Sequence, residues 1–189
     1  MTNIFKRSFI GALLLALISM TLSLQAAPPK SEDALIADLA SPKERDVTAA
    51  LLKLEKEYPT STKAHTAIKG LLSDSRLPVK RKAARVLGVL NAEVSEADVK
   101  NICELLKSAD KWTVIDGLKA LRGLKAQSAI PQIVPFLKHA DKNVIRDACR
   151  TLAVLGDKSL IPSIKPLLEY PDVAVQKDAA DAISILKEK

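Results

Sequence analysis

The amino-acid sequence predicts an all-α protein, a right-handed α-solenoid of about five helix pairs. A repeat is the first reason, because Asp110, Asp141 and Asp172 stand 31 residues apart and a fixed spacing of this size is typical of solenoid units. Composition is the second reason. Of the 189 residues, 48% are hydrophobic and only 3% aromatic, which indicates a folded chain with an aliphatic core. One helix pair cannot bury its own apolar side, so we expect the units to stack into one continuous array.

Residues 1–26 have the pattern of a bacterial secretory signal peptide. Lys6 and Arg7 form a short basic start, the residues up to Leu24 are rich in Leu, Ile and Ala, and Ala26 is a small residue at the expected cleavage site. No cysteine follows the apolar segment, so lipoprotein acylation is excluded. We expect a periplasmic or secreted protein. An uncleaved anchor is the alternative, because the apolar segment is at the lower end of the length that spans a bilayer.

The remaining residues divide into a short leader and a repeat domain. Residues 27–31 contain two prolines and are predicted to be flexible, whereas residues 32–189 are predicted to form one domain. The first unit, 32–57, is degenerate and is expected to cap the array. Within it, Ser41-Pro42-Lys43-Glu44 has the pattern of a capping box with proline at the first helical position.

Each unit is predicted to contain an outer helix followed by an inner helix. Residues 129–137 align with residues 160–168, with the prolines in register. Pro135 and Pro166 lack the N–H that a helix interior uses, so we expect each to kink its short outer helix. Another outer helix is predicted to begin at Ser95, where Ser95-Glu96-Ala97-Asp98 resembles a capping box.

The inner helices share a second repeated pattern. Residues 79–90 line up with 113–124, 144–155 and 175–186 through common Val, Ala and Leu positions. Gly156 follows the third of these segments, as is typical of a helix end. The inner helices are therefore predicted at residues 42–57, 78–91, 112–125, 143–155 and 173–187.

The segment Val79-Lys80-Arg81-Lys82-Ala83-Ala84-Arg85-Val86-Leu87-Gly88-Val89-Leu90 resembles the short HEAT-like repeats of the phycobilisome-lyase type. In that family the second helix reads roughly Val-Arg-x-x-Ala-Ala-x-x-Leu-Gly-x-Leu. Four units match from Ser61 to the C-terminus, and the resemblance implies a HEAT-like solenoid. The sequence departs from the pattern at the Arg after the Val, where it has Lys80, Val114, Ile145 and Gln176.

The sequence offers little for metal binding or catalysis. The candidates His65, His139, Cys103 and Cys149 fall in different helical settings. Cys149 occupies a small-residue position of the repeat, which favours a buried core thiol. Its pairing with Cys103 is disfavoured, because the two residues belong to non-adjacent helices of different type.

The family resemblance raises one enzymatic possibility, which the residues then exclude. HEAT-like iron-dependent hydroxylases carry His-Glu pairs on successive repeats, whereas here His65 is followed by Thr66 and His139 by Ala140. No phosphate-binding glycine loop or Ser-His-Asp pattern is present either. We therefore expect no catalytic residues, no metal ion and no cofactor.

A row of cations on the inner helices is the candidate binding surface, on the side predicted to be concave. The chain carries 29 basic and 22 acidic residues, a net charge of +7. The predicted partner-binding cations are Arg81, Arg85, Lys119, Arg122, Arg146, Arg150 and Lys177. Cations four residues apart on a helix can hold one carboxylate or phosphate together. The alternative is a solvated surface that serves solubility, because Asp116, Asp147, Asp178 and Asp181 lie nearby.

Two further features stand at the starts of the inner helices. The repeated Asp110, Asp141 and Asp172 are expected to cap or brace the turns. Trp112 takes a position where other units have Asn143 and Ala174. It is predicted to be an exposed anchor for a partner, with a cover over the turn as the alternative.

These observations predict a non-enzymatic periplasmic interaction module or scaffold that binds an acidic protein or peptide on its concave inner-helix surface. One alternative, from the resemblance alone, is an enzyme accessory such as a lyase-like chaperone of a cofactor protein. We expect no nucleic-acid partner, because the chain carries an export signal and the basic row lacks aromatic residues on which bases could stack. No stable membrane insertion is expected after cleavage of the signal.

Overall fold

The computed structural model describes residues 30–189, and Glu32–Lys189 forms one compact unit. The predicted signal peptide, 1–26, and most of the predicted leader, 27–31, lie outside the described residues. Every element within residues 30–189 is an α-helix or a 3₁₀ helix. The all-α solenoid of five helix pairs is therefore confirmed.

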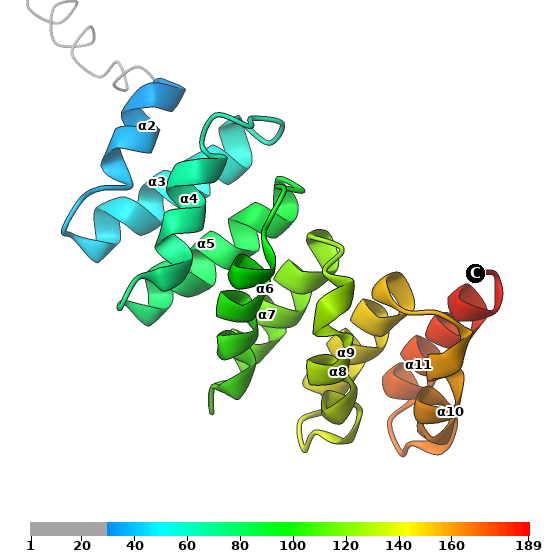
Figure 1. Ribbon diagram of the computed structural model, residues 1–189. Coiled ribbons are helices and arrows are strands. Elements are labelled where there is room, and N and C mark those ends of the chain that lie inside the picture. The colour runs from blue at the N-terminus through cyan, green and yellow to red at the C-terminus, as the bar shows by residue number, and fades with distance from the viewer. Residues whose placement is uncertain (1–29) are drawn as a thin grey trace, which may run out of the picture. The chain divides into compact units, whose positions relative to one another are not determined.

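The inner helices form one continuous row, in which each helix contacts the next (Figure 1). Each one begins and ends within two residues of its predicted bounds. The inner helices are α3 (Glu44–Glu57), α5 (Leu77–Val89), α7 (Lys111–Gly123), α9 (Lys142–Leu155) and α11 (Val173–Lys187). Gly156 follows the last residue of α9, as predicted.

The outer elements form the second layer and are shorter. In every pair after the first, the α-helical part passes into a 3₁₀ helix. They are α2 (Glu32–Asp38), α4 (His65–Gly70) with η2 (Leu71–Ser73), α6 (Glu96–Cys103) with η3 (Glu104–Lys107), η4 (Gln127–Ala129) with α8 (Ile130–Ile133) and η5 (Val134–Lys138), and η6 (Lys158–Leu160) with α10 (Ile161–Ile164) and η7 (Lys165–Glu169).

Proline alone does not explain this change of helix type. The predicted break occurs at Val134 and Lys165, each just before a proline, but the same change occurs at Leu71 and Glu104, where no proline follows. A 3₁₀ turn tightens the end of a helix by bonding residue i to i+3, and short helices commonly end in this way. The short outer helix is thus a property of the unit, and the prolines of the last two units are compatible with it.

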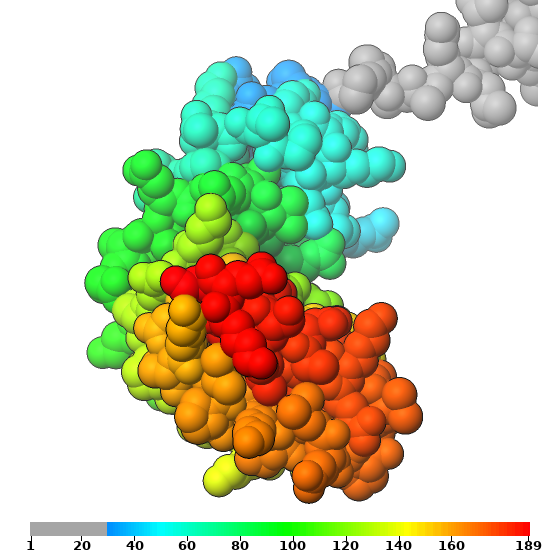
Figure 2. Space-filling model, turned by 90° about the vertical axis from the view of Figure 1, so that its right-hand side faces the viewer, coloured from blue at the N-terminus to red at the C-terminus, as the bar shows by residue number. Residues whose placement is uncertain are grey.

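The core between the two layers is aliphatic, as the composition predicts. The largest fully buried side chains in the described part of the chain are all leucine or isoleucine. Phe136, Tyr58 and Tyr170 pack against this core but are only partly buried. In Figure 2, which faces the C-terminal end of the array, the row of units is bent and hollowed on one side.

Capping side chains explain where several helices begin. Asp110, Asp141 and Asp172 each accept a hydrogen bond from a backbone N–H at the start of the following inner helix, so their predicted capping role is confirmed. The capping box at Ser95 is also confirmed. The predicted box at Ser41 is wrong.

The chain before α3 uses the Ser41 hydroxyl differently. That hydroxyl accepts a hydrogen bond from the Lys43 N–H at 3.2 Å and donates one to Asp46 at 3.0 Å. It therefore braces the turn that precedes the helix. The helix itself begins two residues later than predicted, at Glu44, and its N-cap residue Lys43 makes no side-chain cap.

Helices α5 and α7 come into direct backbone contact. A Cβ atom added at Gly123 on α7 would collide with the backbone carbonyl of Gly88 on α5. A Cβ added at Gly88 would lie 3.0 Å from the Cα of Ala120. The two glycines therefore allow a close approach that no larger residue permits at Gly123.

Candidate functional site

The predicted site residues lie on the solvent-facing side of α3, α5, α7, α9 and α11, which we call the inner surface. Most of its arginines bind carboxylates of a neighbouring helix. Arg81 Nε donates to Asp116 at 2.5 Å, one helix further along the row. Arg146 and Arg150 both donate to Asp178, at 2.6 and 2.9 Å. The arginines thus join one repeat to the next.

Two more arginines take part in the same network. Arg85 donates to Glu55 on the preceding helix at 2.5 Å. Arg122 faces Asp147 with a nitrogen–oxygen distance of 3.6 Å, and neither Arg122 Nη1 nor Asp147 Oδ1 has a hydrogen-bond partner among the described residues. We call the pairs of Arg81, Arg122, Arg146 and Arg150 with Asp116, Asp147 and Asp178 the Arg–Asp ladder.

Burial shows that the ladder is part of the packed structure. Asp147 is 6% exposed and Asp178 is 8% exposed. A buried carboxylate is stable only when cations or hydrogen-bond donors compensate its lost hydration. Removing an arginine from the ladder would therefore destabilise the fold in addition to any effect on ligand binding.

The sequence predicts these acids only as neighbours of the cations on a solvated surface. Asp116, Asp147 and Asp178 are themselves 31 residues apart, so the same repeat signal marks them as a structural series. The pair Arg146 and Arg150 does hold one carboxylate, but that carboxylate belongs to this chain. Arg81 and Arg85 do not act together, since each binds an acid on a different neighbouring helix.

A second series of ion pairs lies at the starts of the inner helices. Lys111 donates to Asp141 at 2.7 Å and Lys142 donates to Asp172 at 2.6 Å. The bound lysines lower the pKa of both aspartates. The pKa of Asp110 is also lowered, chiefly by a hydrogen bond from the Thr113 hydroxyl.

The other predicted site residues remain accessible. Lys119 and Lys177 are exposed, and no acid binds them within residues 30–189. Trp112 is 54% exposed on the first turn of α7, and the Lys111 ammonium lies 5.4 Å from its ring centroid. Its use as an anchor for a partner and its use as a cover over the turn both stay predictions.

Three hollows lie on the inner surface, and two of them are lined by exposed valine or isoleucine side chains. One, of about 360 Å³, lies over α5 and α7 and is lined by Arg85, Val89, Lys119 and Arg122, among others. The other, of about 330 Å³, lies over α9 and α11; its lining residues include Arg122, Arg150, Val154, Asp181 and Ile185. Trp112 lines neither of them. Apolar, cationic and acidic side chains therefore line both of these hollows.

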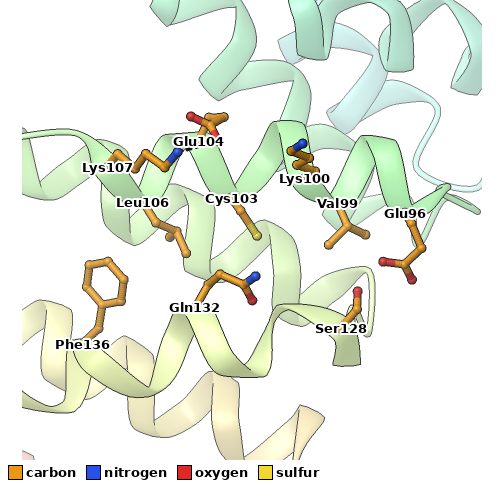
Figure 3. Close-up of a pocket in the computed structure, with 10 residues that line it drawn as sticks. All are labelled: Glu96, Val99, Lys100, Cys103, Glu104, Leu106, Lys107, Ser128, Gln132 and Phe136. Carbon is orange, nitrogen blue, oxygen red and sulfur yellow. Dashed lines mark hydrogen bonds and ion pairs between the residues drawn. The ribbon is translucent and has the colours of Figure 1, made fainter.

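The outer layer carries a larger groove, of about 600 Å³, that no sequence pattern predicts (Figure 3). Val99, Cys103 and Leu106 point into it from α6 and η3, while Gln132 and Phe136 point toward them from α8 and η5. Burial raises the pKa of the Cys103 thiol. None of the predicted partner-binding residues lines this groove.

The histidines and cysteines do not gather into a reactive site. Both cysteines are free, and Cys149 is fully buried, as predicted, with a pKa raised to about 12 by loss of hydration. His139 accepts a hydrogen bond from the Asp141 N–H and stacks on Phe136. Within the described part of the chain, no three histidine, cysteine or acidic side chains are placed to hold a metal ion. The same part contains no helix of the length and apolarity that a bilayer crossing requires.

Comparison with known proteins identifies the repeat. The HEAT repeats family matches residues 130–189, which contain the last two helix pairs. No curated protein shows significant sequence similarity to the chain.

Solved structures extend the similarity to most of the chain. The complex of CpcE and CpcF of phycocyanin lyase from Nostoc sp. PCC7120 is similar with a TM-score of 0.72 and 24% identity, over 88% of this chain and 68% of that chain. An engineered protein has a TM-score of 0.66 and 21% identity, over 84% and 80%. A designed armadillo repeat protein in complex with the peptide (KR)4 has a TM-score of 0.64 and 15% identity, over 81% and 80%. At these identities the similarity shows the fold alone.

Proposed function

Because this chain is a HEAT-like repeat solenoid, we propose that it is a non-enzymatic interaction module of the bacterial periplasm that binds an acidic segment of a partner protein on its inner surface. The positive charge left over after internal pairing carries the proposal. Asp178 is shared by Arg146 and Arg150, so one carboxylate faces two cations.

Two lysines that no acid binds within residues 30–189 add to this excess. Lys119 lines the hollow over α5 and α7, and Lys177 lies on α11 at the repeat position of Arg146. Clustered charge of one sign on a rigid surface attracts the opposite charge and orients it before contact. Because the Arg–Asp ladder holds the neighbouring arginines in place, little side-chain ordering is needed on binding.

The solved relatives support this use of the fold in general terms. A designed armadillo repeat protein with a similar fold was solved with a basic peptide, (KR)4. In this chain the excess charge on the inner surface is positive, so the complementary ligand is acidic. The periplasmic location rests on the signal-like pattern of residues 1–26.

Lys119 and Lys177 are the residues to change in a test, because neither belongs to the ladder. We expect Lys119→Glu with Lys177→Glu to abolish partner crosslinks in the fractionated cell envelope, read by mass spectrometry. The matched control is Lys100→Glu with Lys138→Glu, which makes the same charge change on the outer layer. Equal crosslinking by both double variants, or crosslinked segments without acidic residues, would contradict the proposal.

The location has its own test. Cell fractionation and N-terminal sequencing of the mature protein should place it in the periplasm with its first residue near Ala27. A full-length chain recovered from the cytoplasm would contradict export and would reopen nucleic acid as a partner class.

A further inference from the structure

The inner surface carries a line of exposed aliphatic side chains, and this line points to a more specific ligand. Val89 on α5, Val154 on α9 and Ile185 on α11 are 51%, 43% and 45% exposed. They occupy the same position of the repeat pattern, near the C-terminal ends of three inner helices. Each one also lines the hollow over α5 and α7 or the hollow over α9 and α11.

Helix α7 has a gap at this repeat position. Its residue there is Gly123, which lines the hollow over α5 and α7 together with Val89. The backbone of Gly88 occupies the place that a Cβ of Gly123 would take, so no side chain at this repeat position enters the hollow of about 360 Å³, and the hollow itself has room for a larger ligand group. The order along the row is therefore aliphatic, gap, aliphatic, aliphatic.

Positive charge accompanies the line in both hollows. Lys119 and Arg122 lie within one helical turn of Gly123. Arg150 lies one turn from Val154 and remains 45% exposed at its side chain. The first hollow is lined by three cations and two carboxylates, Glu55 and Asp116. The second is lined by two cations and two carboxylates, Asp178 and Asp181, so the first hollow is the stronger acid-binding position.

The spacing of the helices sets the spacing of the ligand groups. Packed helices lie about 8–10 Å apart, and an extended chain of the polyproline type advances about 9.3 Å in one turn of three residues. Every third side chain of such a chain therefore points to the same side and meets the next inner helix. A β-strand, whose side chains alternate with period two, does not keep this register.

We propose that the inner surface binds an extended acidic peptide segment that carries an apolar residue at every third position, with acidic residues between them. The apolar residues pack on Val89, Val154 and Ile185, and the largest one occupies the gap at Gly123. The acidic residues lie against Lys119 and Arg150. This inference rests on the proposed function and specifies the sequence of its partner.

Three labelled twelve-residue peptides of identical composition test the spacing. The first is Leu-Glu-Ser repeated four times, the second places the leucines at every second position, and the third groups them together. We expect the mature protein to bind the first at least about tenfold more tightly in fluorescence anisotropy, a difference of about 1.4 kcal/mol. A fourth peptide with Phe at an interior apolar position should bind more tightly than one with Phe at a terminal position.

Variants test whether Val154 and Ile185 cause the preference for leucine at every third position. Val154→Ser with Ile185→Ser should remove the tenfold preference, while circular dichroism and Tm confirm folding. The matched control is Leu77→Ser with Val173→Ser, which changes two exposed aliphatic residues at the other end of the inner helices. It should leave the preference unchanged.

The outcomes separate the two proposals. If all three spacings bind equally but Lys119→Glu with Lys177→Glu weakens them, the period-three inference fails and acidic-segment binding stands. If Val154→Ser with Ile185→Ser keeps the preference, the assigned line is wrong. If no peptide binds while envelope crosslinks depend on Lys119 and Lys177, the inference of an extended segment fails and the partner is a folded acidic surface.

Discussion

The inner and outer layers of this array pack against the same core, but the inner helices are longer and more regular than the outer ones. Inner helices run for 13 to 15 residues, whereas the α-helical parts of the outer elements run for four to eight. The inner helices touch each other through backbone and ion pairs. A groove of about 600 Å³ separates two outer elements.

The difference shows where the repeat is under geometric constraint. An inner helix between two others must match both of them, so its capping aspartates and ladder aspartates keep the same 31-residue spacing. An outer element contacts its neighbours less, and its helix type and length vary more freely. Four changes test this contrast, from the largest expected effect to the smallest.

The glycine contact within the inner row should give the largest effect. In Gly123→Ala the added Cβ collides with a helix carbonyl on α5, so the two helices must separate. We expect the free energy of unfolding to fall by about 3 kcal/mol, measured by urea denaturation. The matched control is Gly70→Ala on the outer layer, where an added Cβ meets no atom within 4 Å. An equal fall in the free energy of unfolding in both variants would show that the contact between α5 and α7 is no more sensitive than the outer layer.

The Arg–Asp ladder comes second. Asp178→Ala leaves Arg146 and Arg150 without their carboxylate and should lower the free energy of unfolding by about 2 kcal/mol, visible as a lower Tm. The outer-layer control is Glu104→Gln, which removes an exposed ion pair with Lys107 and should leave Tm unchanged. An unchanged Tm in Asp178→Ala would mean that the ladder positions the arginine side chains without stabilising the fold.

The end of α7 offers a stabilising change. Lys125 has a φ of 53°, and Asn91, at the end of α5, has a φ of 48°. This left-handed conformation is tolerated by asparagine but disfavoured for lysine. Lys125→Gly should therefore raise the free energy of unfolding by about 1 kcal/mol, and Asn91→Gly should raise it less. A larger gain from Asn91→Gly in thermal unfolding would contradict this explanation.

Acid sensitivity should show the smallest effect, because the capping aspartates are near the surface. Their folded pKa values lie below the unfolded value, so the stability they contribute is complete above about pH 4 and is lost as the pH falls through the folded pKa. A Tm profile from pH 7 to pH 2 should be flat at first and then fall. Lys111→Met with Lys142→Met should make that fall shallower. An unchanged profile would exclude these ion pairs as its cause.

Much of the array was predictable because its signals are local. The bounds of the inner helices, the caps at Asp110, Asp141 and Asp172 and the aliphatic core follow from spacing and composition. The capping box at Ser41 was wrong, because the hydroxyl braces a turn that the local pattern does not distinguish from a helix start. Proline as the cause of the break in the outer helices was an incomplete prediction, because the same break occurs at Leu71 and Glu104, where no proline follows.

The candidate site was predictable only as a set of cations. The sequence alone determined which residues repeat and which side of each inner helix they occupy, since helix periodicity depends only on residue order. The tertiary structure decided that Asp116, Asp147 and Asp178 bind the arginines of neighbouring helices, and that Lys119 and Lys177 stay unbound within the described residues. It also decided that Val89, Val154 and Ile185 stay exposed beside the hollows of the inner surface. These relations depend on the distance and rotation between packed helices, which side-chain volumes at the contact set.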